Sequence, residues 1–236
     1  MKAGAPNRWS ERNSALMLAG LAGTLSIALG IAGVLVDQME TFPGTNATAG
    51  EIASFVQANR TALVVAMLLN SVAVSLWLAF GAGVWLWVRE MTGGESFFSA
   101  CFLLGLVSFV TLLFAGFTSF FVLIYRGAEA SDPRLLYDLA FGLLAMSGAP
   151  TALALGSYSV LSLRTHHIPG WTAFLAILAA LAHLALFASF WTTGGFFSLQ
   201  GGVIIAIPAT LFAWILGTSA AMKAAARLEA STASPA

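Results

Sequence analysis

The stretch Phe97–Tyr125, FFSACFLLGLVSFVTLLFAGFTSFFVLIY, decides the fold of this chain. It contains no Asp, Glu, Lys or Arg. As a helix rising about 1.5 Å per residue, it is longer than the ~30 Å hydrocarbon core of a bilayer. Because lipid offers no water to the backbone, an apolar run of this length has to satisfy its own N–H and C=O groups as a helix. It therefore predicts a transmembrane helix.

Five further stretches share this apolar character: Ala15–Val36, Thr61–Val88, Leu139–Leu163, Trp171–Thr192 and Leu199–Met222. Of the 236 residues, 59% are hydrophobic and 8% are charged, whereas a soluble domain carries about 25% charged residues. None of the stretches alternates polar and apolar residues as barrel strands do. We predict an all-α, polytopic membrane protein with six transmembrane helices. The first stretch is longer than the apolar part of a secretory signal, so we expect it to be retained.

The basic residues predict the orientation. With both termini inside, seven of the ten Lys and Arg residues fall on inner segments, and only Arg60, Arg126 and Arg134 fall on outer ones. Cytoplasmic segments carry such an excess, which favours an N-in, C-in arrangement. The expected organisation is a cytoplasmic segment 1–14, a membrane domain 15–222 with an outer loop 37–60, and a cytoplasmic tail 223–236 that is disordered at its end.

Local signals predict three features outside a regular six-helix pattern. Thr48-Ala49-Gly50-Glu51 has the spacing of a capping box, so we expect a short amphipathic helix on the outer membrane surface or over the mouth of the bundle. The alternative is a simple extension of the second span. Asp132-Pro133 predicts a helix start that leads into the fourth span. Pro150 and Pro208 should kink the fourth and sixth spans.

Small residues recur at helical spacing on several spans, where they permit close approach of two backbones. We expect helix packing at Ser71, Ser75 and Gly83 of the second span and at Gly142 and Gly156 of the fourth.

Polar side chains inside the spans are few, and they gather at one depth. Asn70 lies nine residues from Thr61, and His183 lies nine residues from Thr192, so each is about 13 Å below the outer boundary. Interhelical hydrogen bonding is one interpretation. The other is an outward-facing pocket in which His183 is a proton acceptor, a hydrogen-bond anchor or a ligand. The candidate ligand-binding residues are His183, Asn70, Ser147, Met146, Thr118 and Ser119.

The remaining composition bounds the chemistry. No catalytic residues, metal site or cofactor are predicted, and His183 with Met146 is the one pair that could ligate haem or copper. Cys101 is the single cysteine, which excludes an internal disulfide and predicts a small, buried, inert thiol. A formal net charge of zero without a basic cluster argues against nucleic acid as a partner. No carboxylate or basic residue is expected inside a span, which argues against an ion-coupled transporter.

The layout is similar to that of six-helix integral membrane proteins of bacteria, of an actinobacterial type whose function is unknown. The likeness lies in a basic N-terminus, one helix, a polar outer loop with a short helix ending at Asn59-Arg60, and five closely spaced helices. It implies a multi-pass protein of the bacterial plasma membrane and carries over no catalytic residue. The leading hypothesis is a non-catalytic accessory or scaffold subunit, whose partners are membrane lipid and other membrane subunits or a second copy. The alternative is a protein, or membrane enzyme, that binds lipid or a small apolar ligand around His183 and Asn70. A small transporter is the third hypothesis.

Overall fold

The structure, a computed structural model, describes residues 8–37, 42–94, 96–165 and 168–233. Every regular element in these ranges is helical. Six helical segments in them are long and apolar enough to cross a membrane, which confirms the predicted fold class. The elements are α1 (Arg8–Asp37), α2 (Ala49–Ala58), α3 (Arg60–Met91), α4 (Phe97–Arg126), η1 (Gly127–Glu129), α5 (Pro133–Met146), α6 (Gly148–Thr165), α7 (Gly170–Leu184), η2 (Ala185–Phe190) and α8 (Val203–Ala233).

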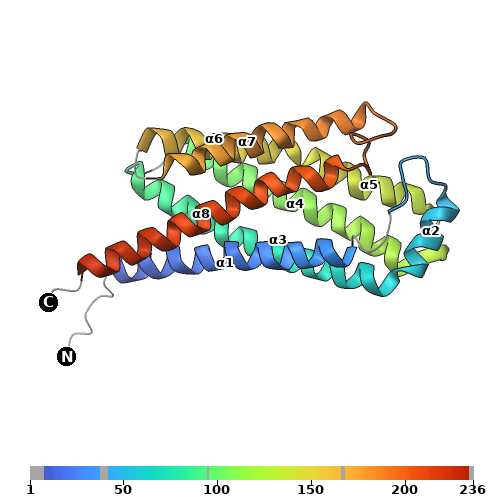
Figure 1. Cartoon of the computed structure of the whole chain (residues 1–236), viewed down its shortest axis with the longest axis horizontal. Coiled ribbons are helices and arrows are strands. Elements are labelled where there is room, and N and C mark those ends of the chain that lie inside the picture. The colour runs from blue at the N-terminus through green and yellow to red at the C-terminus, as the bar shows by residue number, and fades with distance from the viewer. Residues whose placement is uncertain (1–7, 38–41, 95, 166–167, 234–236) are drawn as a thin grey trace.

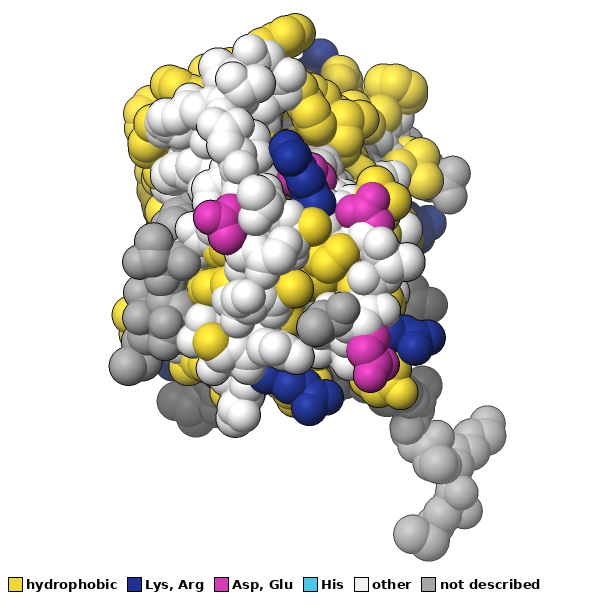
Figure 2. Space-filling view, turned by 90° about the vertical axis from the view of Figure 1, so that its right-hand side faces the viewer, with side chains coloured by type: hydrophobic (Ala, Val, Ile, Leu, Met, Phe, Trp, Pro, Cys, Tyr) yellow, Lys and Arg dark blue, Asp and Glu magenta, His cyan; other side chains and the backbone are white. Residues whose placement is uncertain are grey.

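The spanning helices form a closed ring. Contacts run from α1 to α3, then through α4, α6 and α7 to α8, which returns to α1, while α5 continues α6 beside α4. Arg8 and Ala233 lie at one end of this bundle, called here the termini end, and α2 lies at the other, called the α2 end (Figure 1). Large apolar side chains such as Leu18, Phe174 and Leu181 are exposed along its sides. Acidic and basic side chains lie mostly at the two ends of the bundle, and Figure 2 shows those on the α2 end.

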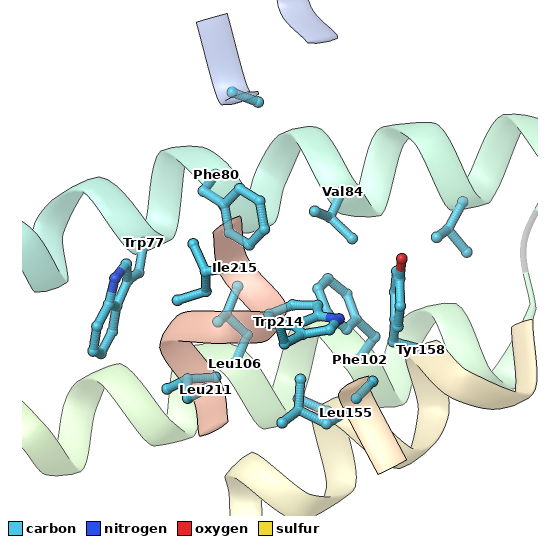
Figure 3. Close-up of a cluster of buried hydrophobic side chains, with 14 of the residues drawn as sticks. Trp77, Phe80, Val84, Phe102, Leu106, Leu155, Tyr158, Leu211, Trp214 and Ile215 are labelled. Atoms are coloured by element: carbon cyan, nitrogen blue, oxygen red, sulfur yellow. The ribbon is translucent and has the colours of Figure 1, made fainter. Parts of the chain in front are cut away.

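Aromatic side chains fill the middle of the bundle and its half toward the termini end. Trp214 packs edge-on against Phe80 and Tyr158, with ring centroids 5.5 and 5.2 Å apart. Phe102 completes the group, and all four side chains are buried (Figure 3). Such pairs add about 0.5–1.5 kcal/mol each beyond the burial of area. This half is therefore a solid core.

The short helix α2 forms as its capping box predicts. The Thr48 hydroxyl accepts a hydrogen bond from the Glu51 N–H, and the Glu51 carboxylate accepts one from the Thr48 N–H at 2.7 Å. A turn at Asn59 separates α2 from α3, so the alternative of a continuous second span is wrong. Ile52 and Val56 are buried in a cluster with residues of α3, α4 and α5. Of the two expected positions, α2 therefore occupies the end of the bundle.

The fourth span is broken where the sequence predicts a kink. Asp132 caps α5 by accepting a hydrogen bond from the Leu135 N–H, and Pro133 occupies its first turn, as expected. The helix ends at Met146, and α6 begins at Gly148. Pro150 has no N–H for the carbonyl four residues earlier, that of Met146, and its ring crowds that carbonyl. In α8, by contrast, the helix is continuous through Pro208.

The sixth span differs from its predicted bounds at both ends. Residues 191–202 form turns, with Gly195 at φ 77°, so α8 begins at Val203 and not at Leu199. At the other end α8 continues through Ala233, because the residues after Met222 are mostly strong helix formers. Most of the tail 223–236 is therefore helix. The last residues, where disorder is predicted, lie outside the described ranges.

Close helix contacts lie mostly at other small residues than those expected. Gly83 does lie against α1, where a Cβ on it would overlap Ala19. Ser75 is exposed, Ser71 is half-buried, and a Cβ on Gly142 or Gly156 would meet no atom within 4 Å. Packing of another helix of the bundle against Ser75, Gly142 or Gly156 is therefore not seen among the described residues, and the prediction for Ser71 stays a prediction. Close approaches of α4 to its neighbours lie instead at Gly105, opposite the Pro150 carbonyl, and at Gly116, opposite the Ala140 carbonyl.

Candidate functional site

A cavity of about 400 Å³ lies inside the half of the bundle toward the α2 end. Its walls come from α1, α3, α4, α5, α7 and α8 together with η2 and the turns before α8. Most of the lining side chains are aliphatic or aromatic, and none of the described residues that line it is charged. The volume falls within the range of about 300–1,000 Å³ that is typical of small-molecule sites.

The mouth of the cavity opens sideways between α1 and α8. Toward the termini end these helices touch, because Gly23 lies against Ser219 and Gly30 lies against Phe212. Toward the α2 end the two helices diverge (Figure 1). There the lining residues Leu35 of α1, 65% exposed, and Ala209 of α8, also exposed, face the outside of the bundle. Since the flanks of the bundle are the apolar surface, this mouth faces lipid.

Aromatic rings close the cavity toward the termini end. Trp77 stacks on Phe109 with centroids 5.5 Å apart and an interplanar angle of 13°, and Phe212 meets Trp77 edge-on at 6.1 Å. All three side chains line the cavity. Below them lies the aromatic core of Figure 3, where a void of only about 10 Å³ remains among apolar side chains. The cavity is therefore a blind pocket.

His183 stands on the wall of the cavity near the end of α7. Its side chain is buried, and its Nδ1 lies 2.8 Å from the Ala179 carbonyl oxygen, one turn earlier in the same helix. A carbonyl only accepts hydrogen bonds, so the hydrogen of the neutral ring sits on Nδ1. Nε2, on the ring edge away from this bond, then carries a lone pair and has no hydrogen-bond partner among the described residues.

The break between α5 and α6 brings Ser147 to the same wall. Gly148 lies so close to α7 that a Cβ on it would overlap the His183 carbonyl. Ser147, next in the chain, lines the cavity and donates its hydroxyl hydrogen to the Leu144 carbonyl at 2.6 Å. Its oxygen keeps free lone pairs. The break therefore places a hydroxyl oxygen and an imidazole nitrogen along one wall.

Asn70 lines the cavity from α3, which stands across the ring from α7. Its side chain lies against α1, where a Cβ on Gly33 would be 2.7 Å from Asn70 Oδ1. The amide is half-buried and makes no hydrogen bond with another described residue. It therefore offers both a donor and an acceptor.

The other three candidate residues do not line the cavity. Met146 is 46% exposed, and Thr118 is exposed with its hydroxyl bonded to the Phe114 carbonyl. Ser119 is buried and donates to the Ala115 carbonyl. All three lie at the expected depth but on other faces of their helices. Met146 is exposed and does not line the cavity that His183 lines, so the structure does not bring together the pair considered for haem or copper.

Two lining residues with polar side-chain atoms, Gln200 and Trp77, are missed by sequence reasoning. The Nε2 of Gln200 donates to Asp138 Oδ1 at 3.0 Å, and its Oε1 is buried without a partner among the described residues. The sequence places Gln200 inside the sixth span, whereas in the structure it belongs to the turns at 191–202, which line the cavity. Trp77 is the second, and its indole N–H is likewise buried without a described partner. The signal for a loop in the sequence is the pair Gly201-Gly202 directly after Gln200.

The sequence does not predict the position of a further polar residue, Lys223, inside the sixth span. It was expected beyond the sixth span, but that span extends from Ala206 to Leu228. Its ammonium donates to Thr24 Oγ1 at 2.9 Å, and Thr24 lies at the middle of the span Glu11–Val36. A cationic side chain thus lies between α1 and α8, on the side of Phe212 toward the termini end. The expectation of spans without an interior charge is wrong at this position.

Metal ligands are not grouped in the described part of the chain, where no three His, Cys, Asp or Glu side chains come together. Cys101 is a free, half-buried thiol that does not line the cavity, and it is less buried than expected. The site thus consists of an apolar pocket with a few uncharged polar atoms.

Comparisons with protein-family models, with curated proteins and with solved structures give no match to this chain.

Proposed function

We propose that this multi-pass protein binds an apolar molecule of the membrane in its blind cavity, and that the molecule enters from the bilayer between α1 and α8. The observation that carries the proposal is the sideways mouth, lined by the exposed residues Leu35 and Ala209. A pocket reached through lipid receives molecules that are dissolved in lipid. The apolar lining supports the same conclusion, because burial of apolar surface favours binding without directional contacts.

The location proposed for the protein is the plasma membrane of a bacterium, with both termini in the cytoplasm. The distribution of Lys and Arg supports this orientation. The α2 end then faces outward, and the cavity opens to the outer leaflet. His183 and Asn70 lie within that leaflet, at the depth of the ligand.

The closed end of the cavity argues for binding and against transport. A transporter needs a route from the site to both sides of the membrane, usually by rocking of one part of the bundle against another. Trp77 and Phe109 close the cavity in this structure, and the aromatic core continues below them. The geometry therefore does not support the transporter hypothesis.

The test is photolabelling with a long-chain alcohol that carries a diazirine, added to the purified protein in lipid nanodiscs. The cross-linked peptides are identified by mass spectrometry. We expect saturable labelling of cavity-lining peptides that unlabelled alcohol competes away. Labelling spread evenly over the lipid-facing surface, without competition, would refute the proposal.

Ala209→Trp is the variant designed to obstruct the mouth, because Ala209 is exposed and lines the cavity. If the indole costs the bound molecule about 1–2 kcal/mol of steric strain, saturable labelling falls about 5- to 30-fold. Ala213→Trp is the matched control, one turn along α8, exposed and outside the cavity. It should label like the wild type, and equal loss in both variants would contradict the assigned entrance.

An accessory or scaffold role, the leading hypothesis from the sequence, is the second candidate. It is favoured by small residues such as Ser75 and Ala79, which lie on the surface of α3 and are not covered by another helix. Such residues let a second membrane helix approach closely. Mass spectrometry after purification in mild detergent should then find a copurifying protein or a dimer, and a lone monomer counts against this role.

A further inference from the structure

We infer that the ligand of the cavity is an uncharged molecule that presents a hydroxyl group to His183 Nε2. This inference rests on the proposed function and adds the chemical class of the ligand. It follows from three features of the wall: the charges, the direction of the hydrogen bonds, and the space.

The charges exclude an ionic head group. None of the described residues that line the cavity is Asp, Glu, Lys or Arg. An ion moved into such a wall loses its hydration and gains no opposite charge, which is a large free-energy cost. Asp138, which accepts a hydrogen bond from Gln200, is itself paired with Arg134 at 3.6 Å and supplies no positive charge to the wall. The polar end of the ligand is therefore neutral.

The hydrogen bonds within the wall leave mainly acceptors for the ligand. His183 commits its Nδ1 hydrogen to the Ala179 carbonyl, and Ser147 commits its hydroxyl hydrogen to the Leu144 carbonyl. Gln200 donates to Asp138, and its Oε1 stays buried and unpaired among the described residues. A ligand with only acceptor atoms, such as a ketone, ether or ester, leaves His183 Nε2 and Ser147 Oγ unsatisfied. A ligand that donates a hydrogen bond satisfies one or more of them.

The opposite wall adds a polar group that can donate as well as accept. The Asn70 amide makes no hydrogen bond with another described residue and offers an N–H as well as an oxygen. A hydroxyl oxygen accepts while its hydrogen donates. An alcohol or phenol therefore matches the wall better than a group with donors alone.

The space sets the size of the apolar part. A volume of about 400 Å³ lies toward the lower end of the usual range for small-molecule sites. The walls include the aromatic rings of Phe109, Phe117 and Phe212, which suit a single chain or a ring system. The ligand class is thus a long-chain or cyclic alcohol of the membrane, such as a prenyl alcohol, a sterol-like alcohol or a phenol with an apolar tail.

The experiment compares three photoreactive probes of equal chain length in nanodiscs: a diazirine-bearing long-chain alcohol, its methyl ether and the corresponding carboxylic acid. An unsatisfied buried acceptor makes binding of the ether weaker, so the alcohol should label cavity peptides at least about fivefold better. The acid should label worse than the alcohol near neutral pH.

Two variants assign the preference to His183. His183→Leu removes the acceptor and should label equally with alcohol and ether. His183→Gln places an amide oxygen near the former Nε2 position and should keep part of the preference. Thr118→Ala is the control outside the cavity, because Thr118 is exposed and its hydroxyl donates to the Phe114 carbonyl, and it should retain the preference. Each variant is first checked for folding by size-exclusion chromatography, and only variants that elute as a single symmetric peak are compared.

The outcomes separate the two proposals. A preference for the alcohol that is lost in His183→Leu and kept in His183→Gln supports the inference. Equal saturable labelling by alcohol and ether in the wild type, or strongest labelling by the acid, overturns the ligand class while the binding function stands. Absence of saturable labelling with all three probes overturns the binding function itself, and the ligand class with it.

Discussion

The hydrogen bonding of His183 leaves one of its two ring nitrogens as an acceptor for a ligand. Its bond to the Ala179 carbonyl, 2.8 Å long, fixes the ring against its own helix and satisfies one of the two ring nitrogens. The other nitrogen has no described partner although the side chain is 2% exposed. A buried acceptor without a hydrogen bond costs about 1–3 kcal/mol. A ligand that supplies the missing hydrogen recovers that free energy.

Lys223 and Thr24 allow a prediction about the contact between α1 and α8. The hydrogen bond from the Lys223 ammonium to Thr24 Oγ1 joins the two helices where they touch. Thr24→Val removes the acceptor and leaves the ammonium inside the span, so it should lower the midpoint of thermal unfolding. Lys223→Met with Thr24→Val should lower it less than the sum of the single changes.

The measurement is a double-mutant cycle by thermal unfolding in detergent. Interhelical hydrogen bonds in membrane proteins contribute about 0.6 kcal/mol on average and up to about 1.7 kcal/mol. We expect a coupling in this range. Additive effects of the two substitutions would contradict the bond.

Glu51 predicts a pH dependence of the helix α2. The backbone N–H of Thr48 donates to the Glu51 carboxylate, and the Thr48 hydroxyl also donates to it, so the pKa of Glu51 is lowered from its ordinary value of 4.5. A carboxyl group whose pKa is lowered by folding stabilises the fold above the unfolded pKa. That stabilisation is lost as the pH falls through the lowered pKa of the folded state.

The measurement is hydrogen exchange of the first amides of α2, followed by mass spectrometry at about pH 6 and about pH 3 with correction for the intrinsic exchange rate. Protection should decrease at the lower pH. In Glu51→Gln the decrease should largely disappear. A decrease of equal size in that variant would contradict the role of the carboxylate.

At the scale of whole helices, the break between α5 and α6 does most to shape the site. It follows from Pro150 and turns Ser147 toward the end of α7. The turns at 191–202 contribute to the site as well, because they place Gln200 in the lining of the cavity. Two interruptions of regular structure thus supply two of the four uncharged polar side chains, and α3 and α7 supply Asn70 and His183.

Two glycines give a matched test of helix packing. A Cβ on Gly105 of α4 would lie 2.7 Å from the Pro150 carbonyl oxygen, whereas a Cβ on Gly156 of α6 would meet no atom within 4 Å. Gly105→Ala should lower stability by about 1–3 kcal/mol through overpacking. Gly156→Ala should be neutral or stabilising, because alanine favours the helix by about 1 kcal/mol.

Thermal unfolding of both variants in the same detergent measures the difference. A lower midpoint for Gly105→Ala than for Gly156→Ala is the expected result. The reverse order would mean that α4 and α6 do not approach as the structure shows.

Over the whole molecule, the sequence predicts the spans because the length of each apolar run can be counted directly along the chain. It also predicts the depth of Asn70 and His183, since depth follows from counting residues along a helix. Whether a residue faces the cavity or the outside of the bundle cannot be counted in this way, because it depends on which neighbours each helix meets. Met146 and Ser147 are adjacent at nearly one depth, yet only Ser147 lines the cavity. Spacing alone cannot separate them.

The mouth of the cavity could not be predicted for the same reason. It exists because α1 and α8, the first and last helices, close the ring of contacts and then diverge. Their contact ends where Gly30 meets Phe212. Such a meeting of distant segments follows from the fit of the whole bundle, and neither segment encodes it locally.

The most direct measurement of the central claim is an electron cryomicroscopy structure of the protein in nanodiscs formed from its own host membrane. The account predicts elongated density that enters between Leu35 and Ala209 and ends beside His183. It predicts that this density is absent in Ala209→Trp. A cavity without such density in the wild type, or one filled by rearranged side chains of α1 and α8, would contradict the account.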